Sequence, residues 1–376
     1  MQVVVVGAGI AGLALAAGLQ RDGHDVRVLE EAPTLRTGGA AIAIWHNGAV
    51  ALRQLGIDLS RHGQVINRLE LWSAKGNQVG WVDAARLSGK FGIDAVTIGR
   101  GELLTHLADS VKPGTIKFGA PAVRAGNRPD SAVIEMGDGT MASGELVVGA
   151  DGHRSAVRGL LADDSAVTPT GWASLQGLTA APLALTAGAT SIYSVGFGSA
   201  VGLMPAGHGL LQWWFDVPWT ADTRPDSMLA WLRERFARWT LSPVRDLLDV
   251  IAEDEIEPFV HGWHRVPAQL SVGRVALIGD AVHAVPPVFA QGANQSIEDA
   301  LVLVQALASA TSVEAALARY GKERRAKMAR LVRSARAPVL PFYGLGGRIP
   351  RGVSAPERLC TWSWGRLMMA FSSTLP

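Results

Sequence analysis

The first thirty residues alternate between apolar runs and glycines in the order expected of a strand, a helix and a second strand. A continuous β-branched run, Gln2–Val6, predicts a strand that is buried on both faces of a parallel sheet. Apolar residues at helical spacing follow as far as Leu19, and Gly23 ends that helix. A second apolar run, Val26–Leu29, leads to Glu30. The chain therefore begins like an α/β protein with a parallel sheet.

Two later segments show a different pattern, in which apolar and polar residues alternate. Residues 67–83 alternate around a turn at Lys75-Gly76-Asn77, which predicts a β-hairpin. Residues 170–218 contain further strand-like runs divided by glycine and proline. We expect one mostly antiparallel sheet built from both segments, followed by helices near residues 228–238 and 244–251. Residues 314–336 predict an amphipathic helix with a basic, solvated face.

Composition narrows the class of protein. The chain has 376 residues, of which 48% are hydrophobic, so we expect a large core in two or three packed domains. A net charge of +2 gives no reason to expect nucleic acid as a partner. The single cysteine, Cys360, excludes an internal disulfide and a cysteine-rich metal site, and no metal is expected. Neither a signal peptide nor an apolar run long enough to span a membrane is evident, so we expect a cytoplasmic location.

The glycines after the first strand fit the pattern G-x-G-x-x-G. Gly7 allows a tight turn, Gly9 leaves room for a pyrophosphate, and Gly12 lets the helix pack closely on the sheet. The helix N-terminus favours the negative charge of a diphosphate. Glu30 can accept hydrogen bonds from a ribose and disfavours a 2′-phosphate at this site. These residues alone allow FAD or NAD, and the alternative is a glycine-rich turn in an ordinary α/β protein.

Four further segments follow in a specific order. They are residues 41–57 (AIAIWHNGAVALRQLGI), 98–107 (IGRGELLTHL), 145–158 (ELVVGADGHRSAVR) and 273–287 (GRVALIGDAVHAVPP). Together with the glycine motif they resemble the FAD-dependent aromatic-ring monooxygenases, the single-component group A flavoprotein hydroxylases with a p-hydroxybenzoate-hydroxylase-like fold. The resemblance spans residues 1–335 and favours FAD over NAD.

The resemblance implies a Rossmann-like FAD-binding domain with an inserted, mostly antiparallel β-sheet substrate domain and C-terminal helices. The expected FAD-binding segments are residues 1–66, 98–168 and 269–311. The substrate segments are residues 67–97 and 169–268, and the C-terminal helical region is 312–376.

The resemblance also implies which residues bind the cofactor. The expected set is Gly7, Gly9, Ala11, Gly12, Glu30, Glu31, Arg36, Arg100, Asp151, Gly152, Gly279, Asp280, Pro287, Gly292, Ala293 and Asn294. Asp280 is expected near the ribityl and diphosphate groups, and Pro287 beside the reactive edge of the flavin. Asp151 has a second interpretation as a helix cap. Arg36 also has a second interpretation, as a solvated surface residue. His283 is expected to have a structural role.

One position departs from the family pattern. Relatives commonly carry glycine before the Gln-Gly pair, where this chain has Ala290. We expect alanine to be tolerated there unless the position needs a positive φ. The residues that follow, 291–294, lead into a helix whose N-terminus would stabilise negative charge on reduced flavin.

The inserted sheet is expected to cover the flavin and to line the substrate site. The candidate lining residues are Trp45, Trp72, Trp81, Leu203, Met204, Pro205, Trp213 and Phe215, and alternation turns only about half of such side chains inward. His46 is the candidate catalytic base, because it could deprotonate a phenol. The alternative is a histidine packed at the domain interface. Many relatives carry an arginine near residues 172–176, and its absence from WASLQ favours a neutral, apolar substrate.

The implied activity is hydroxylation or epoxidation of an apolar, aromatic or secondary-metabolite substrate. NADPH or NADH would reduce FAD, and O₂ would react through a flavin C4a-hydroperoxide. The alternatives are a reductase, a halogenase-like enzyme, and a non-redox FAD-stabilised cyclase or chaperone. The expected partner is a small organic molecule, and the chain is expected to be a monomer or homodimer. A last helix over residues 358–371 would cap the substrate side or form a dimer contact.

Overall fold

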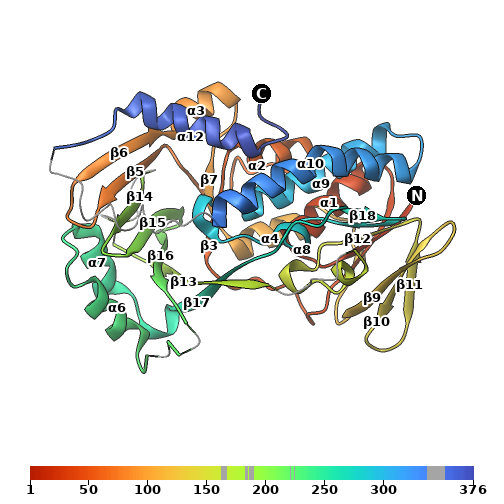
Figure 1. The fold of residues 1–376 in the computed structure, drawn as a ribbon, viewed down its shortest axis with the longest axis horizontal. Coiled ribbons are helices and arrows are strands. Elements are labelled where there is room, and N and C mark those ends of the chain that lie inside the picture. The colour runs from red at the N-terminus through yellow and green to blue at the C-terminus, as the bar shows by residue number, and fades with distance from the viewer. Residues whose placement is uncertain (162–166, 183–184, 186–189, 221, 224, 337–351) are drawn as a thin grey trace.

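The computed structural model describes residues 1–161, 167–182, 185, 190–220, 222–223, 225–336 and 352–376. These residues form two lobes side by side along the long axis of the molecule (Figure 1). A helix-covered parallel sheet occupies one lobe and a mostly antiparallel sheet the other. Residues 337–351 of the expected C-terminal helical region lie outside the described part.

The first lobe is built on a sheet with the strand order β18-β19-β12-β1-β2-β8. The strands are β1 (Gln2–Val6), β2 (Asp25–Leu29), β8 (Ile116–Lys117), β12 (Leu146–Gly149), β18 (Ser271–Val272) and β19 (Val275–Leu277). β1 lies in the interior of the sheet, parallel to both β2 and β12. Its valines are buried on both faces, which accounts for the continuous apolar run at the start of the chain.

Helices cover this sheet. They are α1 (Ile10–Arg21), α4 (Arg100–Asp109), α8 (Asp280–His283), α9 (Gly292–Ser309) and α10 (Val313–Arg336). α9 packs against α1 on one side and α10 on another. It is buried along most of its length, including the charged residues Glu298 and Asp299. Buried charges need partners, and this requirement shapes the site described below.

The second lobe is one sheet with the order β17-β13-β16-β15-β14-β5-β6. The strands are β5 (Arg68–Ser73), β6 (Gln78–Asp83), β13 (Thr168–Ala180), β14 (Thr190–Gly196), β15 (Ser199–Gly207), β16 (Leu210–Pro218) and β17 (Glu257–Trp263). All neighbours are antiparallel except β14 and β5. The predicted α/β fold with an inserted, mostly antiparallel sheet is therefore confirmed, and both inserted segments contribute to that one sheet.

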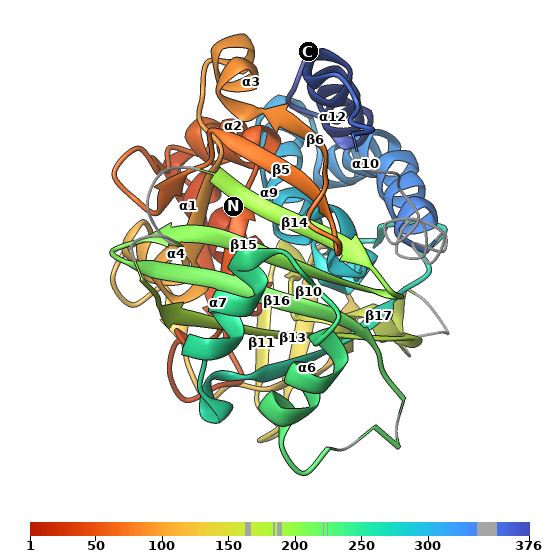
Figure 2. The same cartoon turned by 90° about the vertical axis from the view of Figure 1, so that its left-hand side faces the viewer.

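The two faces of this sheet bury different partners. Helices α6 (Met228–Phe236) and α7 (Ser242–Val250) lie over one face (Figure 2). The side chains of Leu203, Trp213 and Phe215 form a core with these helices. Met204 and Trp214, one position along, join a separate core on the other face with Trp45 of the first lobe. Successive side chains of a strand point to opposite faces of the sheet, so only every second residue can face the cofactor domain.

Smaller elements complete the chain. Two three-stranded sheets comprise β3 (Ala41–Ile44), β4 (Gln64–Val65) and β7 (Val96–Gly99), and β9 (Ala122–Asn127), β10 (Ala132–Met136) and β11 (Met141–Gly144). The remaining helices are α2 (His46–Gln54), α3 (Ala84–Phe91) and α12 (Glu357–Phe371), with 3₁₀ turns at Gly152–Arg154, Val157–Leu160, Glu253–Glu255 and Pro287–Phe289. Of the helices in the described part, none combines the length and apolar character that a membrane crossing requires.

Candidate cofactor and substrate site

The turn between β1 and α1 requires glycine at two positions. Gly7 has φ +102°, and a Cβ there would lie 2.4 Å from the carbonyl oxygen of Ala150. A Cβ on Gly12 would lie 2.0 Å from the carbonyl oxygen of Gly7. A Cβ on Gly9, in contrast, would meet nothing within 4 Å. Gly7 and Gly12 therefore allow close backbone contacts in which a side chain would clash. Gly9 faces open space where a diphosphate could approach.

Glu30 sits at the end of β2, beside this turn. Its carboxylate accepts hydrogen bonds from the backbone N–H groups of Ala8 at 2.7 Å and Ala32 at 2.9 Å. The two neighbouring predicted residues, Glu31 and Arg36, are exposed and form an ion pair with each other at 2.6 Å. Their role in cofactor binding stays a prediction, and their pairing agrees with the solvated interpretation of Arg36.

Gly279 is the point at which three distant segments meet. Its φ is +62°, and a Cβ there would lie 3.0 Å from both Ala11 Cβ and Ser296 Oγ. The first turn of α1, the start of α8 and the second turn of α9 are therefore in contact around one glycine. Asp280 follows as the first residue of α8, with its side chain exposed.

Two helices begin at this place without a side-chain cap. Neither α1 nor α9 has a side chain that accepts from its first N–H groups. A Cβ on Gly292, the first residue of α9, would meet nothing within 4 Å. Uncapped N–H groups and the positive end of the helix dipole favour an anion at each N-terminus. Both helices are thus suited to negative charge, one at each side of Gly279.

The side-chain amide of Asn294 forms hydrogen bonds with the protein backbone. Its Oδ1 accepts from the backbone N–H of Trp45 at 2.9 Å, and its Nδ2 donates to the carbonyl oxygens of Ala43 at 3.0 Å and Ala290 at 2.7 Å. The side chain thereby fastens the end of β3 to the first turn of α9. Any contact of Asn294 with the cofactor would come from its backbone.

Arg100 and Asp151 are two further charged residues of the predicted cofactor set. Arg100 is half-buried beside Gly39 and forms no ion pair with any residue that the structure describes. Burial raises the pKa of the Asp151 carboxyl, although hydrogen bonds from Ser155 and Val157 oppose this. The side chain of Asp151 does not cap the 3₁₀ turn that it precedes, but it accepts from the N–H of Val157, the first residue of the next 3₁₀ turn, at 3.2 Å. Gly152 follows with φ +77°.

The segment before α9 contains a strained residue. Ala290 ends the 3₁₀ turn at φ +48°, in the left-handed region. Alanine is expected to be tolerated here unless the position needs a positive φ. The position does have a positive φ, so alanine is strained there. An alanine there costs about 1–2 kcal/mol relative to its ordinary conformation. Pro287 is exposed at the start of this turn, whereas Pro286 is buried.

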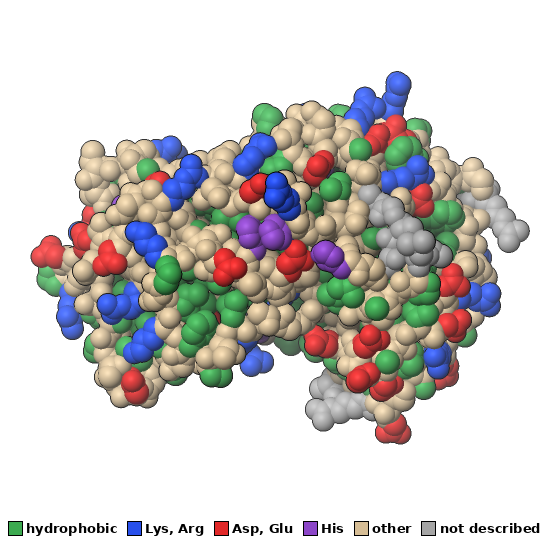
Figure 3. All heavy atoms as spheres, turned by 180° about the vertical axis from the view of Figure 1, so that it is seen from behind, with side chains coloured by type: hydrophobic (Ala, Val, Ile, Leu, Met, Phe, Trp, Pro, Cys, Tyr) green, Lys and Arg blue, Asp and Glu red, His purple; other side chains and the backbone are tan. Residues whose placement is uncertain are grey.

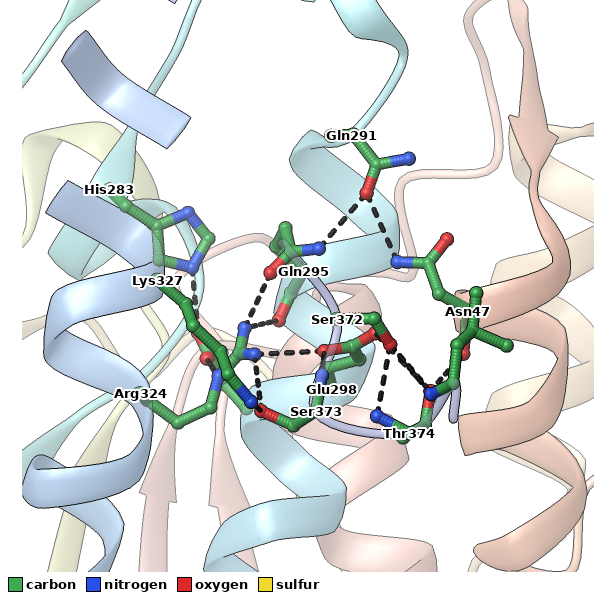
Figure 4. A network of polar contacts seen from close by, with 12 residues as sticks. Asn47, His283, Gln291, Gln295, Glu298, Arg324, Lys327, Ser372, Ser373 and Thr374 are labelled. Carbon is green, nitrogen blue, oxygen red and sulfur yellow. Dashed lines mark hydrogen bonds and ion pairs between the residues drawn. The ribbon is translucent and has the colours of Figure 1, made fainter. Parts of the chain in front are cut away.

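A buried network of charges links α9 to α10 (Figure 4). Arg324 of α10 donates from Nε to Asp299 Oδ1 at 2.6 Å and from Nη1 to Glu298 Oε2 at 2.8 Å. Asp299 Oδ2 lies 2.7 Å from His283 Nε2 and accepts from the backbone N–H of Gly279 at 2.9 Å. Although burial opposes it, Arg324 and His283 hold the pKa of Asp299 below its ordinary value. The network therefore fixes the Gly279 turn, and the bond of His283 to Asp299 agrees with the structural role expected of this histidine.

The C-terminal residues complete this network. Glu298 accepts from the Ser372 hydroxyl at 2.7 Å and from the backbone N–H of Ser373 at 2.7 Å. Gln295 Nε2 donates to Gln291 Oε1 at 2.9 Å, and Gln291 accepts in turn from Asn47 at 3.0 Å. A chain of hydrogen bonds thus joins the end of the protein to the start of α9 and to α2.

His46 is completely buried at the start of α2. Its Nε2 lies 3.2 Å from Ser88 Oγ of α3, and its ring lies 5.5 Å from that of Phe91. Burial lowers the pKa of His46 to about 4. This environment favours the packed alternative, and the role of His46 as a base stays a prediction.

The predicted lining residues divide between the two faces of the antiparallel sheet. Trp72, Leu203, Trp213 and Phe215 pack in the core beneath α6 and α7, on the face turned away from the cofactor domain. Trp81 lies under the Arg68 guanidinium, which is 3.8 Å from its ring centroid. Trp45 and Met204 share the core that includes Met368 of α12, so of this set they are placed toward the cofactor domain.

Alternation along β16 identifies residues that the sequence analysis did not select. Gln212, Trp214 and Asp216 lie on the same face as Met204, and Gln212 Oε1 accepts from the backbone N–H of Ala41 in β3. Asp216 accepts from the Ser174 hydroxyl at 2.6 Å, and that hydroxyl also lies 2.7 Å from His261 Nε2. Ser174, Asp216 and His261 lie on β13, β16 and β17, so only the pairing of these strands brings them together.

These residues fit FAD. Two uncapped helix N-termini and the open positions at Gly9 and Gly292 suit the diphosphate, and Glu30 suits the ribose. Arg100 supplies a cation with no carboxylate partner in the described part of the chain. The residues that would hold the cofactor come from segments near positions 9, 30, 100, 280 and 292. Gly279 brings the segments near 9, 280 and 292 together, and Glu30 joins them through the Ala8 N–H.

Comparison with known proteins agrees with this geometry. The FAD binding domain family matches residues 1–335. The chain is 32% identical to an aurachin C monooxygenase/isomerase of Stigmatella aurantiaca, over 85% of this chain and 84% of that one. It is 31% identical to an FAD-dependent urate hydroxylase of Klebsiella pneumoniae, over 89% of both chains.

Solved structures lead to the same family. The crystal structure of Klebsiella pneumoniae HpxO complexed with FAD and uric acid is similar to this chain with a TM-score of 0.84 and 30% identity. The similarity covers 89% of this chain and 87% of that one. The expected resemblance and the expected cofactor are thereby confirmed. The chain belongs to the FAD binding domain family and is an FAD-dependent monooxygenase of the group A flavoprotein hydroxylase type.

Proposed function

We propose that the enzyme uses NADH or NADPH to insert one oxygen atom of O₂ into an apolar organic substrate, by hydroxylation or epoxidation. The observation that carries the proposal is the meeting of α1, α8 and α9 around Gly279, with two uncapped helix N-termini at one place. The proposal gains support from relatives whose names describe monooxygenation or hydroxylation.

When bound, FAD would supply the redox chemistry, taking a hydride from the nicotinamide and activating O₂ by the C4a-hydroperoxide route expected from the sequence. The protein would supply position and electrostatics. The α9 N-terminus would stabilise negative charge on the reduced ring, because its N–H groups are uncapped. Asp280 and Arg100 would contact the polar part of the cofactor, and Pro287 would lie beside its reactive edge.

We place the substrate between the antiparallel sheet and the first lobe. Trp45, Met204 and Trp214 contribute apolar side chains to the core between the two, and Tyr193 stacks on Trp214 with a centroid distance of 6.1 Å. An apolar environment excludes water from the reacting centre. An aromatic or secondary-metabolite substrate suits these side chains, and the names of the relatives include aromatic substrates such as 3-amino-4-hydroxybenzoate. A cytoplasmic location and a monomer or homodimer remain part of the proposal.

The test combines two measurements on the purified holoenzyme. NADH or NADPH should reduce the bound flavin in the absence of O₂, which is read from the loss of its absorption bands. With ¹⁸O₂ and a screen of phenols, polyketide aromatics and indoles, the product should carry one ¹⁸O atom. Product without ¹⁸O would reject oxygen insertion.

The same experiment separates the alternatives. A reductase would form its product without O₂, and a non-redox cyclase would act without NADH or NADPH. A halogenase-like enzyme would require halide, and the Trp-x-Trp-x-Ile-Pro signature expected of it is absent from the sequence.

A further inference from the structure

The outer side of α3 and α12 forms a basic and apolar surface. We define the α3–α12 face by six residues, namely Arg86, Lys90, Arg358, Leu359, Trp362 and Arg366. All six are exposed, and Trp362 and Leu359 expose 62% and 53% of their surface. Such exposure is unusual for large apolar side chains that lie next to one another on a helix.

The spacing along α12 makes this a continuous stripe. Positions 359, 362 and 366 follow one another at intervals of three and four, and position 358 precedes 362 by four, so Trp362 is flanked along one side of the helix by the other three residues. Arg86 and Lys90 are related in the same way on α3. A cavity of about 390 Å³ lies between the two helices, and apolar atoms of Leu87, Trp362 and Met369 contribute to its lining.

The four cations of this face have no ion-pair partner in the described part of the chain. Among the residues that the structure describes, none of the four forms an ion pair. Arg366 lies instead over the Trp362 ring, at 5.9 Å. Two nearby carboxylates are engaged elsewhere. Asp83 caps α3 by accepting from the Arg86 N–H, and Glu357 accepts from the Thr361 hydroxyl within α12. Charges of both signs are interspersed over most of the face in Figure 3.

We propose that the α3–α12 face docks the enzyme on a membrane surface that contains anionic lipid. Lysine and arginine can place their charges among lipid headgroups while their alkyl stems remain in apolar surroundings. An indole at the headgroup level and a neighbouring leucine supply the apolar part of the contact. The basic residues complement the negative surface potential of such a membrane.

A second copy of the chain is a poorer occupant. In a two-fold symmetric dimer through this face, the same patch would meet itself and bring four unpaired cations against four others. The inner side of α12 already packs against the rest of the protein. Trp364 packs edge-on against Trp45 at 5.0 Å, and the Asp83 N–H donates to Thr361 at 2.9 Å. The outward stripe is therefore the part of α12 that remains for a partner.

The experiment is co-sedimentation of the full-length holoenzyme with vesicles. We expect binding to vesicles of mixed phosphatidylcholine and phosphatidylglycerol, but not to phosphatidylcholine alone. Each basic residue near an anionic surface contributes about fivefold, so Arg358→Gln combined with Arg366→Gln should weaken binding about 25-fold. The control, Arg128→Gln with Arg245→Gln, removes the same net charge from exposed sites on other elements and should bind like the natural protein. Leu359→Ser with Trp362→Ser should also weaken binding, although all cations remain.

The outcomes that overturn the proposal are distinct. Equal binding by the α3–α12 variant and its control would mean that net charge, not this face, drives the association. Failure of the natural protein to sediment with anionic vesicles would reject docking altogether. A lipid-free dimer that Trp362→Ser dissolves would assign the face to a second copy. If inorganic phosphate releases the enzyme from vesicles at a much lower ionic strength than sodium chloride does, that result would assign the α3–α12 face to a soluble anion. None of these readouts depends on the proposed oxygenation.

Discussion

Arg324 Nε lies 2.6 Å from Asp299 Oδ1, and both side chains are completely buried. Asp299 also holds the Gly279 N–H, so this ion pair links helix α10 to the turn expected to face the cofactor. Glu298 adds a second buried carboxylate on the same guanidinium. One arginine thus stabilises two negative charges in the interior of the first lobe.

Removal of that arginine should be strongly destabilising. Arg324→Met leaves Glu298 and Asp299 buried without their cation, and breaking such pairs costs about 3–5 kcal/mol of the free energy of unfolding. Urea denaturation measures this change. Arg333→Met, at an exposed position of the same helix, should change stability by less than about 0.5 kcal/mol. Similar losses in both variants would contradict the role given to Arg324.

The strain at Ala290 predicts a stabilising substitution. Ala290→Gly should raise the free energy of unfolding by about 1 kcal/mol, because glycine adopts a positive φ without a Cβ clash. Ala308→Gly, at an exposed helical position of α9, should lower it by about 1 kcal/mol. Thermal denaturation of the two variants compares them directly, and destabilisation by Ala290→Gly would show that no strain is present.

The open space at Gly9 predicts a separation of folding from cofactor binding. Gly9→Ala meets no protein atom within 4 Å, so stability of the protein without cofactor should be unchanged. Its methyl group would occupy the expected diphosphate space and should weaken FAD by at least about tenfold, which is about 1.4 kcal/mol. Gly321→Ala is the matched control, because it also meets nothing within 4 Å but lies in α10. Fluorescence titration with FAD distinguishes them, and unchanged affinity of Gly9→Ala would place the diphosphate elsewhere.

Two buried histidines make stability depend on pH. Burial lowers the pKa of His46 and of His261 to about 4 in the folded protein. The unfolded chain takes up these protons near pH 6.5, so stability falls as the pH decreases from about 6.5 to about 4. Each histidine should remove about 2 kcal/mol of the free energy of unfolding between pH 7 and pH 5.

Substitution isolates this contribution. His46→Gln should flatten the pH dependence of urea denaturation by about 2 kcal/mol over the same interval. His153→Gln, at an exposed position, shows how the profile responds to loss of an imidazole in general. A profile for His46→Gln that parallels the natural protein would contradict the buried, neutral state of His46.

The sequence was most informative where the backbone itself is constrained. The glycine at position 7 has a positive φ and that at position 12 packs against backbone, so both requirements appear directly as residue type. Alternation indicated the antiparallel sheet, but not which face of each strand meets the cofactor domain. Trp213 and Trp214 are adjacent, and only the packing of α6 and α7 shows that Trp213 points away.

Contacts between distant segments could not be predicted in this way. Ser174 and His261 are 87 residues apart and meet only because β13 pairs with β17. Arg324 belongs to a helix that the sequence described as basic and solvated, yet this one arginine faces inward. Its partners lie on α9, and no local pattern around Arg324 indicates them. Asn294 was selected for the cofactor, but its side chain is fully used by Trp45, Ala43 and Ala290.

The central claim is that segments around Gly9, Gly279 and Gly292 together hold one FAD. The most direct measurement is the flavin content of the purified protein, by absorption spectrum and by titration of cofactor-free protein with FAD. The account predicts a yellow protein that binds about one FAD per chain, consistent with a single such site. A colourless protein that takes up no added FAD would contradict it.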